Sequence, residues 1–258
     1  LNAINRELSV VQSRIATGLR VASAKDDPST WAIAQMQRSE VGGLEQVKLS
    51  LKRGQSVLDV ALMAGETISD LVLQMKDKAI AAMDFPVGST ERAALNEDYL
   101  SLRRRIDQVA NTSDFNGINL ISAGGTGAVR SLADTKGGRM EVDHIDLSTT
   151  GAALTGLPAD LTGAVDSTTI EALSTGLANV SNALGRFGTG HKALQTHLEF
   201  VEKQQDTLQA SIGRLVDADL AKESARWQAL QVRQQLAIMA LSMANRQPSI
   251  ILQLFQQR

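Results

Sequence analysis

Three histidines are the side chains of this 258-residue chain best suited to binding a metal or transferring a proton. His191 and His197 stand six positions apart. On a helix this spacing turns them about 240° away from each other, so they cannot share a metal ion. His144 and Asp146 share one face of an extended segment, but two ligands without a third make a poor metal site. The histidines therefore predict no metal centre.

Other motifs that might carry chemistry lack an essential part. The run GGTG from Gly124 has no Lys-Ser or Lys-Thr ending to hold a phosphate, so it predicts a loop. Acidic residues flank Arg103–Arg105 without interleaved aromatics, which is typical of a solvated, ion-paired helix face rather than a nucleic-acid site. Asp217 and Asp219 suit a helix cap better than a calcium loop. The chain has no cysteine. We therefore predict no catalytic residue, no cofactor and no enzymatic activity.

Composition points instead to long helices that pack on one another. Aromatic residues make up only 3% of the chain, and there are four prolines. Small apolar side chains allow close helix packing, and scarce proline permits long uninterrupted helices. The net charge of −2 indicates no general attraction to nucleic acid or to anionic membranes.

Apolar residues spaced alternately three and four apart, called a seam below, are typical of coiled coils. The first seam holds Leu1, Ile4, Leu8, Val11 and Ile15. Asp27 before Pro28 predicts that a second helix begins there. Its seam comprises Leu44, Val47, Leu51, Gly54, Leu58, Ala61, Gly65, Ile68, Val72, Met75 and Ala79.

Further helices are expected beyond the break FPVGST. One carries Leu95, Tyr99, Leu102, Ile106 and Val109 and ends near Asn111. Residues 118–165 predict a small β-hairpin turning at Lys136–Gly138. The longest helix follows a capping box of Thr168 and Glu171. Its seam runs from Ile170 to Ile212 without a slip, and the spacing of Val216 and Leu220 then predicts a stutter.

The segment LAIMALSMA, Leu236 to Ala244, contains a single polar residue, Ser242. A helix that is hydrophobic all round must be buried on every side. This run is too short to span a bilayer, so no membrane insertion is predicted. The short seam of residues 1–15 can cover only one side, and the remaining sides need another partner.

Five segments, in order, resemble bacterial flagellin, the subunit of the flagellar filament. These are RIATGLRVASAKDDPSTWAIA, RGQSVLDVALMAGETISDL, TSDFNGINLI, GHKALQTHLEFVEKQQDTL and LVDADLAKESARWQALQVRQQLAIMALSMANRQPSIILQLF. The second and fourth look closest to the short flagellins of alphaproteobacteria. The resemblance covers essentially the whole chain.

The resemblance implies a mainly α fold: a long, antiparallel, coiled-coil-like helical bundle with a small β-hairpin region and paired N- and C-terminal helices. Residues 1–16 and 217–258 match the inner-core domain, whose N-terminal part is expected to be incomplete. Residues 17–30 match a linker, and residues 31–216 the outer helical domain with the hairpin region 118–165. The residues expected to form the inner core are Leu1, Ile4, Leu8, Val11, Ile15, Val216, Leu220, Trp227, Leu230, Ala237, Leu241, Ile250, Leu254 and Phe255.

The resemblance also implies a function and partners. The chain is expected to self-assemble into the flagellar filament that drives swimming, as a homo-oligomer outside the cell. Export through the flagellar type III system without a cleaved signal, an export chaperone and a filament cap are implied as well. In enterobacterial flagellins the stretch QRVRELAVQ is read by an innate immune receptor, Toll-like receptor 5. Here the matching stretch LQMKDKAIA has Gln74 where the first Arg is expected.

The sequence leaves two other hypotheses about function open. A hook–filament junction protein shares the terminal seams, although the ending SIILQLF resembles flagellin. A coiled-coil adhesion or signalling module would form a stable oligomer without growing into a filament. A flagellin carrying an enzyme would need an inserted catalytic domain, and residues 118–165 are too few for one.

Overall fold

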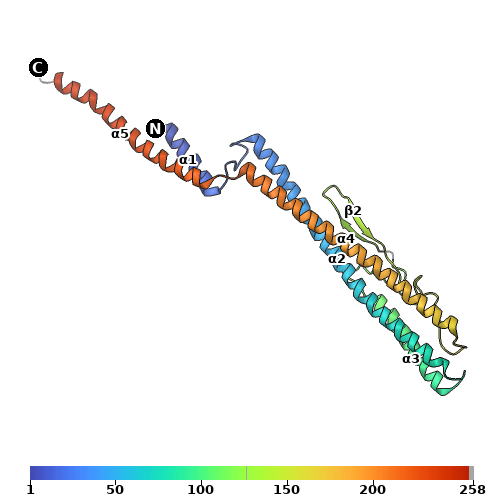
Figure 1. Ribbon diagram of the computed structural model, residues 1–258. Helices are drawn as coiled ribbons and strands as arrows, with labels where there is room; N and C mark the ends of the chain where they lie inside the picture. Colours follow the sequence, from blue (N-terminus) through green and yellow to red (C-terminus); the bar gives the residue numbers. More distant parts are fainter. Residues whose placement is uncertain (126, 256–258) are drawn as a thin grey trace. The chain divides into compact units, whose positions relative to one another are not determined.

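The computed structural model describes residues 1–125 and 127–255, with side-chain surroundings described through residue 243. Its helices are α1 (Asn2–Thr17), α2 (Pro28–Met83), α3 (Thr90–Thr112), α4 (Ser167–Val216) and α5 (Leu220–Phe255), and its strands are β1 (Val129–Leu132) and β2 (Arg139–Val142). The mainly helical fold with one small antiparallel hairpin is confirmed. Figure 1 shows these elements in sequence colours.

The chain divides into two compact units. The first unit holds Leu1–Gly42 and the chain from Gln205 onward, and the second holds Gly43–Gln204. Helices α2 and α4 contribute residues to both units.

Aspartate side chains begin three of the helices. Asp27 Oδ1 accepts hydrogen bonds from the backbone N–H groups of Ser29 and Thr30, and α2 starts at Pro28 as predicted. The hydroxyl and backbone N–H of Thr30 hold the pKa of Asp27 below its usual range, because both favour the ionised carboxylate. Asp219 caps α5 by accepting from the N–H groups of Ala221 and Lys222, so its predicted role is confirmed.

Two sequence predictions about helix ends are wrong. Asp166, rather than a box of Thr168 and Glu171, caps α4: its Oδ1 accepts from the N–H groups of Thr168 and Thr169. A carboxylate at this position satisfies free N–H groups of the first turn. The predicted stutter near Val216 is a complete break, because α4 ends at Val216 and α5 begins at Leu220.

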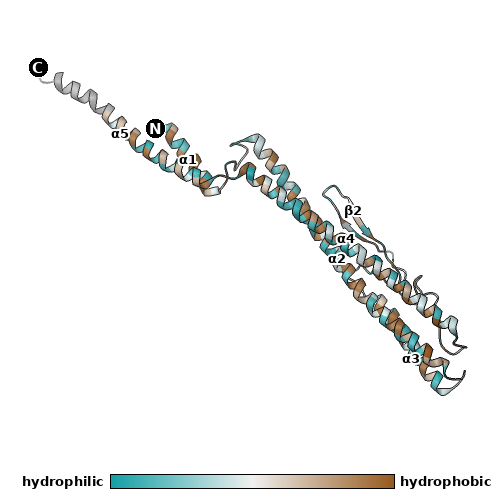
Figure 2. Ribbon diagram, viewed as in Figure 1, coloured by the Kyte–Doolittle hydropathy of each residue, from teal (hydrophilic) through white to brown (hydrophobic). Residues whose placement is uncertain are grey.

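The seam predicted along α2 forms the core of the second unit. Its nine residues other than glycine are all buried. Both of its glycines permit close approach, as expected: a side chain at Gly65 would collide with Leu184 of α4, and one at Gly54 with Ser131 of β1. Apolar and polar colours recur in turn along α2 and α4 in Figure 2. The α4 seam is also buried or half-buried throughout.

The hairpin lies against the glycines of two helices. Strands β1 and β2 pair antiparallel, with Val129 opposite Val142. Next to the contact at Gly54, the hydroxyl of Ser50 on α2 accepts a hydrogen bond from the backbone N–H of Leu132. Strand β2 meets α4 where Val142 approaches Gly190. Gly137 has a φ of 95°, as expected for the hairpin turn.

The buried face of α3 differs from the predicted one. Tyr99 and Ile106 are buried as expected, but Leu95, Leu102 and Val109 are half-buried while Arg92 and Asn96 are buried. The Arg92 guanidinium donates hydrogen bonds to the carbonyls of Phe85, Leu161 and Gly163. Asn96 accepts from the N–H of Leu161. The spacing of apolar residues did not predict this face, because irregular backbone covers it. The carbonyl and N–H groups of that backbone need polar partners.

Replacing Gly54 by alanine should destabilise the second unit by about 1–3 kcal/mol, because the added methyl overpacks the contact between α2 and β1. The matched control is Gly188→Ala on α4, where nothing lies within 4 Å of the added atom. Alanine there should stabilise the helix by about 0.5–1 kcal/mol. Thermal unfolding followed by circular dichroism measures both changes, and shifts of the same sign would contradict this account of the seam glycines.

Candidate assembly surface

The first unit is built on the pairing of α1 with α5. Leu8 and Val11 of α1 are buried against Leu230 of α5. Ile4, Ile15 and Trp227 pack around this cluster and are partly buried. The helices run antiparallel, since Leu1 shares a groove with Leu241, while Gly18 accepts a backbone hydrogen bond from Ala218. Figure 1 shows α1 beside the first half of α5.

Local structure is also well defined at the junction where α1 ends and the chain passes from α4 to α5. α1 ends at Gly18, whose φ of 70° is the left-handed conformation common at helix C-termini. The Val216 carbonyl then accepts hydrogen bonds from the N–H groups of Arg20 and Val21. Val216 is therefore buried with Val21 and Ala34 rather than with the α1–α5 cluster.

Much of the apolar surface of α5 remains exposed. Leu236, Leu241 and Met243 are 59%, 53% and 66% exposed, and Ile238 and Met239 are similarly open. These residues point in several directions around the helix. They match the prediction that this segment is apolar all round, and α1 covers only part of it.

The other predicted inner-core residues have different surroundings. Leu1 and Leu220 are exposed and Ala237 is half-buried. Ile250, Leu254 and Phe255 belong to α5 by backbone, and their side chains lie outside the described part of the chain. The structure thus brings Ile4, Leu8, Val11, Ile15, Trp227 and Leu230 together.

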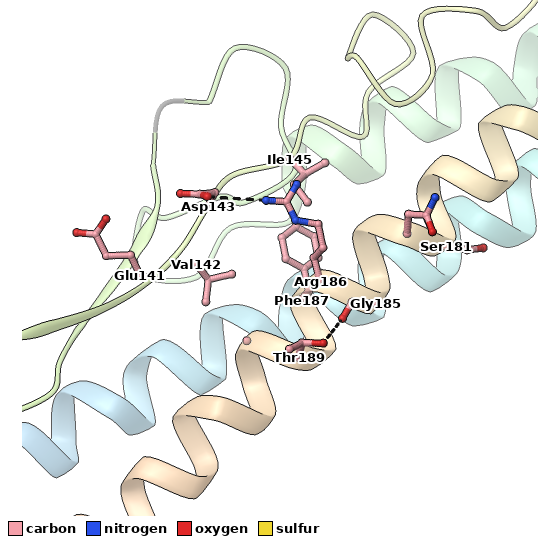
Figure 3. Close-up of a pocket in the computed structure, with 11 residues that line it drawn as sticks. Glu141, Val142, Asp143, Ile145, Ser181, Gly185, Arg186, Phe187 and Thr189 are labelled. Carbon is pink, nitrogen blue, oxygen red and sulfur yellow. Dashed lines mark hydrogen bonds and ion pairs between the residues drawn. The ribbon is translucent and has the colours of Figure 1, made fainter.

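A hollow of about 600 Å³ lies between β2 and α4 and has charged side chains in its lining. Figure 3 shows the Arg186 side chain reaching Asp143, and their charged groups are 3.8 Å apart. Glu141 is directed away from Arg186 and pairs with Arg130 instead. Asp143 and Arg186 are both mostly exposed, so water screens their charges. Two of the charged lining residues of this hollow, Asp143 and Arg186, thus form an exposed ion pair.

Each histidine has a local hydrogen-bonding partner. His191 Nε2 lies 3.1 Å from the Asp59 carboxylate, and His197 Nε2 lies 2.6 Å from the carbonyl oxygen of Ala133. His144 Nε2 interacts with the Ser122 carbonyl. In the described part of the chain, no three His, Asp or Glu side chains are grouped to hold a metal ion. No described helix is long and apolar enough to cross a membrane.

The arginine run on α3 has a structural role that the sequence did not indicate. Arg103 donates hydrogen bonds to the carbonyls of Pro158 and Ala159 instead of pairing with a neighbouring acid. Asp107 accepts from the backbone N–H and hydroxyl of Thr149. The expectation of a solvated, ion-paired face is thus wrong for these two residues, because the segment 149–159 covers them.

Two family models match most of the chain. The bacterial flagellin N-terminal helical region matches residues 1–126, and the bacterial flagellin C-terminal helical region matches residues 170–255. The chain is 45% identical to flagellin FljK of Caulobacter vibrioides over 256 residues, covering 99% of this chain and 93% of that protein. It is 30% identical to a flagellin of Brucella melitensis over 267 residues, covering 99% and 94%.

Solved structures share the fold at lower identity. The crystal structure of Bacillus cereus flagellin is 24% identical, with a TM-score of 0.50, and the match covers 59% of this chain and 88% of that one. A putative flagellar hook-associated protein from Vibrio parahaemolyticus is 16% identical, with a TM-score of 0.62, and the match covers 74% and 100%.

Proposed function

The chain belongs to the bacterial flagellin family, and from that premise we propose that α1 and α5 are the part of the subunit that polymerises. The protein is a structural subunit of the flagellar filament, which lies outside the cell. The observation that carries the proposal is the exposed apolar surface around Leu236–Met243, which α1 leaves open.

Copies of the same chain are the partners that this surface fits. Burying one exposed Leu or Ile side chain contributes about 1.5–3 kcal/mol. A surface that is apolar in several directions needs several neighbours, and a helical polymer supplies them through repeated non-closing contacts. A flagellin polymerises into a filament, so the exposed residues of α5 have a covering partner in identical subunits.

The two-layer organisation implied by the resemblance is part of this proposal. Residues 1–16 and 217–258 would form the inner core, and residues 31–216 the outer domain with the hairpin region. Residues 17–30 would connect the two layers. The structure supports a connection there, because α1 ends at Thr17 and α2 begins at Pro28. In this assignment the inner-core side chains assemble and no residue catalyses a reaction.

Leu241→Asp should abolish polymerisation while leaving the subunit folded. Leu241 is 53% exposed in the single chain, so the substitution costs little there, but a carboxylate buried at a subunit contact loses its hydration. Elongation of filament seeds, followed by light scattering and electron microscopy, measures the effect. Leu241→Met is the control, because an apolar residue of similar volume should preserve elongation. Normal filaments from Leu241→Asp would contradict the assignment of this surface.

Export is proposed to proceed through the flagellar type III apparatus, with an export chaperone and a filament cap as further partners. The family supports this proposal, and the absence of cysteine from the chain leaves no disulfide to fix a bulky folded state before export. Deleting the flagellar export apparatus should eliminate the protein from the medium. Undiminished secretion by such a strain would overturn the proposed route.

Recognition by the innate immune receptor is expected to be weak. Gln74 is exposed on α2, and it has neither the charge nor the forked donors of the arginine expected there. Receptor-reporter cells exposed to purified monomer should respond much less than to an enterobacterial flagellin. Gln74→Arg is the matched variant, and it should raise the response. A full response to the unmodified chain would refute the importance of this position.

A further inference from the structure

The interface between α1 and α5 contains a buried carboxylate. Glu223 of α5 is buried, and its side chain is 11% exposed. Its Oε1 lies 3.2 Å from Nη1 of Arg14, which projects from α1. The side chain of Arg14 is 28% exposed, so the cation retains access to water. The two charges of this pair are therefore buried to different depths.

The surroundings of Glu223 leave it dependent on Arg14. Its second oxygen, Oε2, is buried without a hydrogen-bond partner among the described residues, and so is the indole N–H of Trp227 one turn along α5. Losing the counterion of a buried carboxylate is strongly unfavourable, because the poorly hydrated charge is left without a partner. Losing Glu223 is milder, since the partly exposed guanidinium of Arg14 can be hydrated.

Apolar packing specifies the alignment of these helices only weakly. Leu8, Val11 and Leu230 are the buried apolar residues of the cluster, and both helices repeat apolar positions at heptad spacing, although Glu223 and Gln234 interrupt the series on α5. Sliding one helix by a heptad would therefore bring apolar residues together again. The same slide would place Glu223 opposite Glu7 and Leu8 in one direction, or Arg14 opposite Leu230 in the other.

Within one chain, backbone hydrogen bonds join the two segments at one end of the helix pair. The Ala218 N–H donates to the Gly18 carbonyl, which ties the two segments at one end of the pair. In a polymer of identical copies, every α5 offers the same repeated seam to every α1. A buried charge in an apolar seam is a known way to specify register.

We infer that the Arg14–Glu223 ion pair, rather than the apolar seam, selects the partner and register with which α1 packs on α5. The inference rests on the proposed function in one respect, that the α1–α5 pair is the polymerising part. The two residues of the pair have unequal roles. Glu223 penalises every arrangement in which it lacks a cation, and Arg14 relieves that penalty in a single register.

Chemical cross-linking can measure the register directly, because the chain has no cysteine of its own. Asn5 Oδ1 accepts a hydrogen bond of 2.8 Å from Gln234 Nε2, near the far end of the helix pair. In an Asn5→Cys, Gln234→Cys background, a short bis-maleimide should join the two helices in the native register. An Asn5→Cys, Leu241→Cys background reports a slide of one heptad.

Both cysteine backgrounds are used to compare three variants, namely Arg14→Met, Glu223→Met and the double variant. Arg14→Met should lower the native cross-link by at least about tenfold and raise the slipped one, because Glu223 loses its counterion. Glu223→Met should lower the native cross-link less than about threefold, and the double variant should recover to a similar level. Circular dichroism verifies that all variants retain the second unit.

Unchanged native cross-linking in Arg14→Met would overturn the inference, as would a double variant as defective as Arg14→Met. Seed elongation by the unmodified chain is measured separately. A chain that forms the native cross-link but does not elongate seeds would contradict the proposed function and leave the register assignment standing. If the unmodified chain elongates seeds normally and Arg14→Met cross-links in the native register as well as the wild type does, the register assignment alone would be contradicted.

Discussion

The incomplete burial of α5 is the constraint on which the functional interpretation depends. Helix α1 covers α5 along one side, through a small cluster centred on Leu8, Val11 and Leu230. Farther along, Leu236, Leu241 and Met243 remain open. A single chain cannot bury a helix that is apolar in every direction, so the remaining stabilisation must come from other molecules. In the proposed assembly those molecules are copies of the same chain.

In the second unit, a different set of side chains stabilises the packing. Its long helices bury continuous seams, and small residues such as Gly54 and Gly65 let the hairpin and α4 approach α2 closely. Where irregular backbone covers α3, Arg92 and Asn96 hold it through buried hydrogen bonds. This unit thus buries the apolar seam of α2 within one chain, whereas the apolar segment of α5 around Leu236–Met243 stays exposed.

Polar groups within the first unit add the specificity that repeated apolar seams lack. Backbone hydrogen bonds join Gly18 to Ala218 and Val21 to Val216 where both chain segments leave their helices. Beyond this point Arg14 meets Glu223, and Asn5 meets Gln234. Directional contacts at both ends of a short apolar cluster favour one alignment, because a slide would break them all.

The amino-acid sequence by itself determined the helical segments, the hairpin, the helix start at Pro28, the buried seams of α2 and α4 and the unusual apolar character of Leu236–Ala244. These follow from periodicity, capping and turn chemistry, which act between near neighbours in the chain. Five sequence motifs, in order, also indicated the family. Only the tertiary structure placed Val216 with Val21, Arg92 under irregular backbone and Glu223 against Arg14. It also showed that the helix is broken between α4 and α5, where the sequence predicts a stutter. Those features depend on contacts between distant residues, and a local pattern does not contain the partner that satisfies a buried polar group.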